Sequence, residues 1–215
     1  ENIPMLVICI STKLSGSMQS ALSARQLVLE DYPDARIRVI DSTYCTVLQG
    51  LLALEAASMQ ERGAGFDETA DRIEAIRKTG RIFFTVGNLE YLQAGGRIGR
   101  VAGVAGTLLG IRPVITMKDG EIFPSGISRS RKKTLDRTVA LLKEYVQQFG
   151  GTAKKYSLAA GFGFDGEEAE SYRRAVVEQM KGWLSPEDLP LYQIGATIGV
   201  HTGPYPLGLG ILERA

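Results

Sequence analysis

Short apolar runs that alternate with helical patterns are the feature that most constrains the fold of this chain. The first run, residues 4–10, is too short for a helix, and its unbroken hydrophobicity is typical of a strand buried on both faces of a parallel sheet. Apolar residues then recur at helical spacing from Met18 to Leu29, and a second strand-like run follows at residues 37–40. The sequence therefore predicts a β-α-β unit and an α/β fold.

The same alternation continues along the chain and predicts two α/β domains. The first, residues 1–79, is expected to hold a small parallel sheet flanked by helices, and the second, residues 80–215, a mixed sheet with helices. Further helices are predicted at residues 47–60, 67–78, 90–92, 135–146 and 169–180, and further strands at residues 81–86, 111–117, 121–124, 156–160, 191–200 and 207–212. Because Asp119-Gly120 is a strong hairpin signal, an antiparallel pair joins the second sheet.

The composition argues against several classes of function. Among 215 residues, 25 are Lys or Arg and 24 are Asp or Glu, and the resulting net charge of +1 is too small to hold nucleic acid by electrostatics alone. One histidine and two cysteines without metal-ligand spacing argue against a metal centre. No apolar stretch reaches the roughly 18 residues that cross a bilayer, and no signal sequence is visible. We expect a cytoplasmic protein without stable membrane insertion.

The loop at residues 11–17 is the first candidate binding site, because ligands of open α/β sheets lie beyond the carboxyl ends of the strands. It carries four hydroxyl side chains and a glycine between a strand and a helix N-terminus, where backbone N–H groups and the helix dipole favour an anion. The alternative is that Ser15 or Ser17 caps the helix.

His201 is the only histidine and is expected in a turn after a buried strand, facing the same cleft as the first loop. A structural role in that turn is the alternative. Residues 161–166 fit the G-x-G-x-x-G pattern of dinucleotide-binding loops, but Asp165 would place a carboxylate where a pyrophosphate should lie. We therefore do not favour nucleotide binding there.

One dense basic cluster, residues 128–133, stands at the start of the helix that follows it. Cationic side chains oppose the dipole at a helix N-terminus, so an anion or an acidic partner is expected to compensate them. The alternative is a helix start that is simply solvated.

Five short motifs stand in order along nearly the whole chain. They are Ile-Ser-Thr-Lys-Leu-Ser-Gly-Ser at residues 10–17, Val-Ile-Asp-Ser at 39–42, Leu-Glu-Tyr-Leu-Gln-Ala-Gly-Gly-Arg-Ile at 89–98, Lys-Asp-Gly at 118–120 and Ile-Gly-Val-His-Thr-Gly-Pro at 198–204. In order and approximate spacing this set resembles the DegV family of bacterial fatty-acid-binding proteins. The resemblance implies a two-domain α/β protein that holds one fatty acid between its domains.

The resemblance also implies roles for individual residues. The fatty-acid carboxylate is expected near Thr12, Ser15, Gly16 and His201, whose hydroxyl groups, helix N-terminal amides and ring N–H suit a carboxylate. The acyl chain is expected in a tunnel of the second domain, beside a run of small residues whose alternative explanation is close helix packing. This run is Ala102, Gly103, Val104, Ala105 and Gly106.

Proteins of this family serve as the lipid-carrying subunit in bacteria that have a fatty acid kinase. The resemblance thus implies no turnover by this chain alone, no cofactor besides the bound fatty acid, and a separate kinase protein as partner. Arg129 matches a basic position that the family is thought to use toward the kinase or the forming acyl phosphate.

Two other functions stay open at this point. One is an acyl hydrolase with Ser11, Thr12 or Ser15 as nucleophile, His201 as base and Asp41 as orienting acid, although the chain has no G-x-S-x-G elbow. The other is a kinase-binding regulatory module with vestigial lipid affinity.

The chain departs from the family pattern in two places. The family begins with a further strand–helix segment, whose Thr-Ser-Gln-Pro motif adds a hydroxyl to the head-group site, so we expect this sequence to be a fragment or that segment to be another chain. The usual Gly-Pro-Gly turn after the histidine is Gly203-Pro204-Tyr205-Pro206 here. Because tyrosine does not readily adopt a positive φ, this turn is expected to differ.

Overall fold

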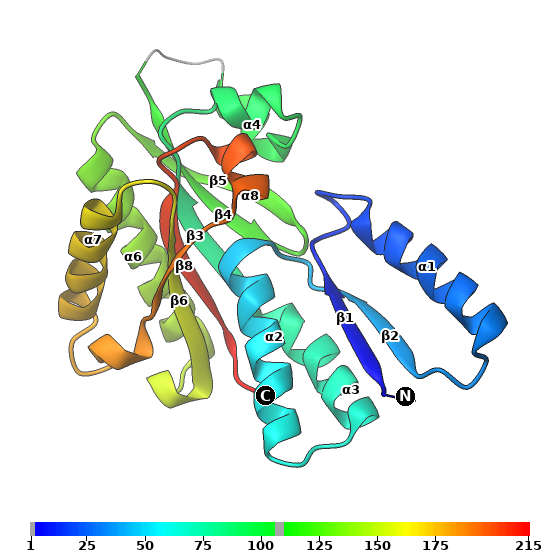
Figure 1. The fold of residues 1–215 in the computed structure, drawn as a ribbon. Helices are drawn as coiled ribbons and strands as arrows, with labels where there is room; N and C mark the ends of the chain where they lie inside the picture. The colour runs from blue at the N-terminus through cyan, green and yellow to red at the C-terminus, as the bar shows by residue number, and fades with distance from the viewer. Residues whose placement is uncertain (1–2, 106–109) are drawn as a thin grey trace.

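The computed structural model describes residues 3–105 and 110–215, and its elements follow the predicted alternation (Figure 1). In chain order they are β1 (Met5–Cys9), α1 (Ser17–Asp31), β2 (Ile37–Asp41), α2 (Thr46–Glu61), α3 (Phe66–Ile76), β3 (Arg81–Thr85), α4 (Glu90–Ala94), α5 (Ala102–Ala105), β4 (Arg112–Lys118), β5 (Glu121–Ser128), α6 (Arg131–Phe149), β6 (Tyr156–Phe162), α7 (Gly166–Gln179), β7 (Leu191–Gln193), α8 (Ala196–Thr202) and β8 (Leu207–Glu213). None of the helices in these two ranges has the length and apolar character needed to cross a bilayer.

The described residues form two sheets. β1 and β2 pair in parallel, with Met5 opposite Ile37 and Cys9 opposite Asp41. The larger sheet has the order β5-β4-β3-β8-β6-β7. It is mixed, because β6 and β7 pair in parallel whereas its other neighbouring strands pair antiparallel. The predicted fold class, a small parallel sheet and a mixed sheet, both with helices, is confirmed.

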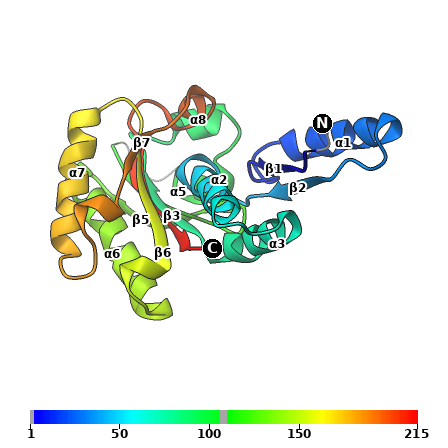
Figure 2. The same ribbon diagram turned by 60° about the horizontal axis from the view of Figure 1, so that its bottom comes forward.

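Helices cover both faces of the larger sheet (Figures 1 and 2). On one face, α2 and α3 build a core in which Leu48 lies with Ile115. On the other face, α6 and α7 build a second core in which Leu142 lies with Leu209. Since α2 and α3 come from the first 79 residues, the first core contains side chains from both sides of the predicted boundary at residues 79/80. That boundary stays a prediction.

The hairpin between β4 and β5 links the two sheets. Its turn residues Asp119 and Gly120 have φ angles of 52° and 85°, the left-handed pair expected of a tight Asp-Gly turn. The hydroxyl of the buried Ser11, directly after β1, donates to the carbonyl oxygen of Gly120 at 2.8 Å. β1, β2 and α1 otherwise stand to one side of the larger sheet, as Figure 2 shows.

The strand predicted at residues 191–200 is wrong in its second half. β7 ends at Gln193, and α8 follows it. The β-branched residues of α8 favoured a strand in the sequence analysis. In the structure, Ile198 and His201 lie three residues apart, at helical spacing, and line a cavity, while Val200 is exposed. His201 therefore lies in the last turn of a helix and not in a turn after a strand.

The turn after α8 accommodates its departure from the family pattern without strain at Tyr205. The positive φ falls on Gly203, at 73°, directly after the helix, and Tyr205 is not among the residues with positive φ. A glycine at this place is the common way to end a helix.

Candidate functional site

An apolar cavity of about 160 Å³ lies between the first part of the chain and the larger sheet. Its walls come from the loop after β1, the start of α2, the strands β3, β4, β5, β6 and β8, α4 with the segment that follows it, and α8. The apolar side chains in these walls include Leu14, Val47, Phe84, Leu92, Met117 and Ile122, and the polar ones Ser15, Thr46, Arg97, Thr197, His201 and Thr202. A hollow that is mostly apolar with a few polar groups is typical of a small-molecule site.

Two glycines on neighbouring strands help to shape this cavity. Gly161 of β6 lies opposite Gly208 of β8, and both line the cavity. A Cβ atom added at Gly161 would lie 2.9 Å from Cγ1 of Val47. The absence of side chains here leaves room between the sheet and α2.

Packing also accounts for the rest of the G-x-G-x-x-G pattern. A Cβ atom at Gly163 would overlap the carbonyl oxygen of Pro204. The carboxylate of Asp165 caps α7 by accepting the N–H of Glu168 at 2.8 Å. The end of β6 and the start of α7 thus use this pattern for close contact and helix capping.

His201 contributes an unpartnered polar atom at the wall of the cavity. Its Nδ1 atom is buried and has no hydrogen-bond partner within residues 3–105 and 110–215. The ring packs against Gly95, where an added Cβ atom would overlap Nδ1, so that only glycine at 95 leaves room for it. Buried polar atoms in proteins are nearly always hydrogen-bonded. Because the His201 ring also lines the cavity, its Nδ1 atom is free to bond to a ligand oxygen once the ring turns from Gly95 toward the cavity.

Thr12 is placed outside this cavity. It is exposed, and its hydroxyl donates to Oδ2 of Asp41 at 2.7 Å. The other carboxylate oxygen of Asp41 accepts the N–H of Thr43 at 2.7 Å. Thr12 is therefore held by the end of β2, and contact with a ligand in the cavity would require its side chain to leave Asp41.

Ser15 and Gly16 lie closer to the predicted head-group site. Ser15 lines the cavity together with His201, and its hydroxyl accepts the N–H of Ser17 at 3.2 Å. Gly16 is the N-cap residue of α1 and offers no side-chain cap, so the first turn keeps N–H groups other than that of Ser17 for an anion. The structure thus brings Ser15 and His201 to one cavity and Gly16 next to it. The head-group roles of these residues and of Thr12 remain predictions.

Two strained residues flank the part of the cavity wall that leads into α2. Thr43 and Thr46 have φ angles of 60° and 50°, which are costly for β-branched residues and often occur at functional sites. Cys45, between them, lines the cavity, and burial raises the pKa of its thiol to about 11. No sequence pattern pointed to these three residues.

Arg97 was not predicted as a site residue, although it belongs to the motif at residues 89–98. Its side chain lines the cavity, and its Nε and Nη1 atoms donate to the carbonyl oxygens of Leu14 at 3.1 Å and Gly95 at 2.9 Å. It therefore ties the loop before α1 to the segment that contacts His201.

The predicted acyl tunnel and the observed cavity have no described residue in common. Ala102 and Gly103 are exposed and do not line the cavity. The side chains of Val104 and Ala105, and Gly106 as a whole, lie outside the described residues. The tunnel at residues 102–106 stays a prediction.

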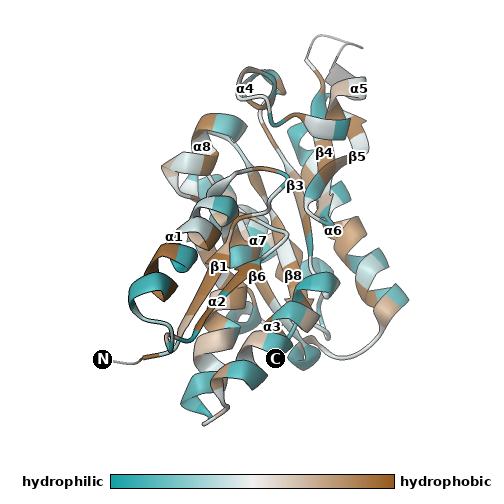
Figure 3. Ribbon diagram, turned by 90° about the vertical axis from the view of Figure 1, so that its right-hand side faces the viewer, coloured by the Kyte–Doolittle hydropathy of each residue, from teal (hydrophilic) through white to brown (hydrophobic). Residues whose placement is uncertain are grey.

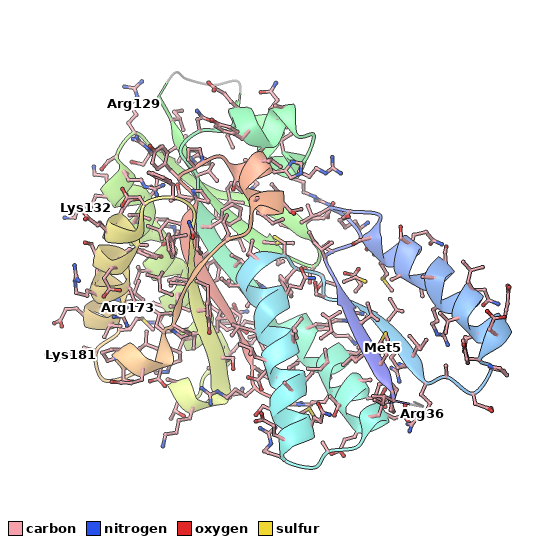
Figure 4. The ribbon with its side chains drawn as sticks, viewed as in Figure 1. Met5, Arg36, Arg129, Lys132, Arg173 and Lys181 are labelled. Atoms are coloured by element: carbon pink, nitrogen blue, oxygen red, sulfur yellow. The ribbon has the colours of Figure 1, made fainter. Side chains whose placement is uncertain are left out.

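In the basic cluster at residues 128–133, Arg131 forms an ion pair and Arg129 points into solvent. Arg131 donates from Nε and Nη2 to the carboxylate of Glu168 at 2.9 and 2.7 Å, so an acidic residue of α7 compensates it. Arg129 is exposed and forms no ion pair with the part of the chain described, and Figure 4 shows it pointing outward beyond the end of β5.

The hydrolase alternative lacks an assembled nucleophile and base in the described residues. The hydroxyl of Ser11 is buried and bonded to Gly120, and that of Thr12 is bonded to Asp41. Neither they nor Ser15 share a hydrogen bond with His201 in the described structure, whereas a nucleophile activated by histidine requires such contact.

Fold and site together define an α/β protein that encloses an apolar ligand cavity between a small parallel sheet and a larger mixed sheet. The chain belongs to the DegV family. The family model, described as "Uncharacterised protein, DegV family", matches residues 3–214, which confirms the resemblance seen in the five motifs.

Related proteins agree with this assignment. The chain is 31% identical to a DegV domain-containing protein of Streptococcus pyogenes serotype M1 over 215 residues, which is all of this chain and 71% of that protein. A stearic-acid-binding protein from Eubacterium ventriosum is 41% identical, with a TM-score of 0.91 over 99% of this chain and 71% of that one. A DegV family protein from Thermus thermophilus, described for its fatty acid binding, is 28% identical, with a TM-score of 0.85 over 98% and 71% of the two chains.

Proposed function

We propose that this chain binds one long-chain fatty acid. The acyl chain is buried in the cavity, and the carboxylate lies at the junction of the two sheets. The observation that carries the proposal is the apolar cavity lined by His201, a residue whose Nδ1 atom has no hydrogen-bond partner in the described residues. Each buried methylene contributes about 0.8 kcal/mol, so a long chain offsets the cost of ordering the ligand.

The carboxylate requires hydrogen-bond donors because an unpaired charge at a partly buried site is costly. Ser15 and His201 line the same cavity, and the start of α1 follows directly at Gly16. Thr12 adds a further donor when its hydroxyl turns from Asp41 to the ligand. The known binding of stearic acid by the relative from Eubacterium ventriosum supports this class of ligand.

The protein acts as a carrier without turnover of its own and presents the carboxylate to a separate kinase for acyl-phosphate formation. The exposed Arg129, which has no ion-pair partner in the described residues, is available to a phosphate or an acidic surface of that kinase. No cofactor other than the bound fatty acid is needed by the chain.

Native mass spectrometry followed by denaturing extraction tests the binding. We expect one intact fatty acid on the unmodified chain and its loss or strong reduction in the double variant Thr12→Ala/His201→Ala. Thr152→Ala, an exposed threonine on the turn before β6, is the matched control and should retain the ligand. An unmodified chain that carries no fatty acid and takes up none when it is added would contradict the proposal.

A coupled assay with a fatty acid kinase and ATP tests the presentation step. Arg129→Glu is expected to abolish acyl-phosphate formation while fatty acid binding is unchanged. Lys143→Glu, the same reversal of charge at a partly exposed lysine of α6, serves as the control. Full acyl-phosphate formation by Arg129→Glu would show that Arg129 does not have this role. Loss of both fatty acid binding and acyl-phosphate formation would indicate damage to the fold.

A further inference from the structure

An exposed groove runs along the outside of the cavity, between the first half of α2 and the segment that joins β7 to α8. Small and apolar residues line it, among them Gly50, Ala53, Leu54 and Tyr192. The side chains of Leu54 and Tyr192 are 54% and 44% exposed. The groove is therefore an apolar surface that is open to solvent.

The groove and the cavity share part of their walls. Thr46, Val47 and Ile194 line both spaces. A Cβ atom added at Gly161, on the floor of the cavity, would lie 2.9 Å from Cγ1 of Val47 and 3.6 Å from Cγ2 of Ile194. Two aliphatic side chains thus stand between the cavity floor and the groove at this place, so an acyl chain reaches the groove only when they move aside.

Gly50 gives an independent reason to assign a ligand to the groove. It lies inside α2, where glycine is less stable than alanine or another helix former. Its φ is not positive, and a Cβ atom added there would meet nothing within 4 Å. Neither the backbone nor a close contact requires glycine, but a side chain at this position would fill the groove.

We infer that the groove is a second subsite for the same ligand and holds the methyl end of a long acyl chain that passes between Val47 and Ile194. This inference rests on the proposed function. An acyl chain is the occupant that the observations favour, because the groove is apolar and shares Thr46, Val47 and Ile194 with the cavity wall. The cavity takes the first part of the chain, and the groove extends the range of lengths that the protein accepts.

Blocking the groove tests this assignment. Gly50→Trp and Ala53→Trp each place a large side chain in the groove, whereas Ala57→Trp adds the same side chain to an exposed position of α2 that does not line it. Binding is measured by titration calorimetry for saturated straight-chain acids from dodecanoic to eicosanoic acid, and folding of each variant is checked by thermal unfolding.

In the unmodified chain, affinity is expected to rise by up to roughly fourfold per methylene as length increases, which is the usual transfer free energy of a methylene converted to a ratio. In both blocking variants, the rise should stop at a shorter acid, while the shortest acids bind as before. Ala57→Trp should follow the unmodified chain at every length.

An unchanged length dependence in the two blocking variants would overturn the groove assignment and leave the proposed function intact. The same holds for a folded blocking variant that loses affinity equally at every length, since the groove would then not distinguish long from short acids. An unmodified chain that binds no acid of any length would overturn the proposed function and the groove assignment together.

Discussion

Helices α1 and α2 show how differently two helices of one chain bury apolar residues. α1 buries none of its residues, and Leu27 is 63% exposed. α2 buries a full face against the larger sheet, and Leu48 is completely covered. In Figure 3, hydrophobic colour also marks β1, a strand next to α1. Apolar periodicity therefore forms a helix in both places, but a core forms only where the rest of the fold covers the apolar face of the helix.

The largest effect that would test this contrast is expected in the core of α2. Leu48→Ala should lower the free energy of unfolding by about 2–5 kcal/mol, because it removes buried methyl groups and leaves a cavity. Leu27→Ala makes the same change on exposed α1 and should stay within about 0.5 kcal/mol. Urea denaturation of both variants measures the difference, and equal losses would end the contrast between the two helices.

The reactivity of the two thiols, Cys45 before α2 and Cys9 in β1, gives a second comparison of these two regions. Burial raises the pKa of Cys45 to about 11, and the pKa of Cys9 in β1 is raised by burial first and by Asp41 second. A thiol reacts as its thiolate, so at neutral pH Cys45 should alkylate about a hundredfold more slowly than a thiol with the ordinary value of 9.0. Its rate should keep rising with pH toward 11.

Iodoacetamide labelling followed by peptide mass spectrometry measures the two sites separately. Added fatty acid should protect Cys45, which lines the cavity, and leave Cys9 unaffected, because Cys9 does not line it. Equal protection of both thiols would show that the ligand acts on the whole fold and not on the cavity.

The contributions of His201 and Thr12 to head-group binding compare the side of the larger sheet with the side of the small sheet. His201→Ala is expected to weaken fatty acid binding by about tenfold to a hundredfold, since its buried ring nitrogen has no other partner in the described residues. Thr12→Ala should cost less than about threefold, because its hydroxyl already bonds to Asp41 and must exchange one partner for another. Titration calorimetry gives both values, and a larger loss for Thr12→Ala would reverse this order.

A smaller loss of stability than that of Leu48→Ala is expected where the two sheets are linked. Ser11→Ala removes the donor from the buried carbonyl of Gly120 and should cost about 1–2 kcal/mol. Amide hydrogen exchange in β1 and β2 should accelerate, while exchange in β8 is unchanged. Ser20→Ala, exposed on α1, is the control. Unaltered exchange in Ser11→Ala would show that the hairpin contact does not hold the small sheet.

Local sequence signals predicted most of the fold correctly. The apolar run before Cys9, the helical spacing in α6 and the Asp119-Gly120 turn depend on neighbours in the chain, and each was found as expected. Residues 196–202 were assigned wrongly because β-branched side chains such as Ile198 occur on a buried helix face as well as in a strand. The choice between the two depends on what the segment packs against.

The site was less predictable than the fold. His201 and Ser15 were singled out from motifs, and the structure brings both to the cavity. The contributions of Cys45 and Arg97 to its wall carried no separate signal, since their role depends on the loops that fold around them.

The sequence by itself determined the order of most strands and helices, the tight turn of the β4–β5 hairpin and the family, because local periodicity and motifs are properties of neighbouring residues. Only the tertiary structure decided that Thr12 bonds to Asp41, that His201 keeps a free nitrogen, and where the cavity lies. The physical reason is that these contacts join segments far apart in the chain. Their geometry follows from how β1 pairs with β2, how α2 packs on the larger sheet and how α8 packs against α4.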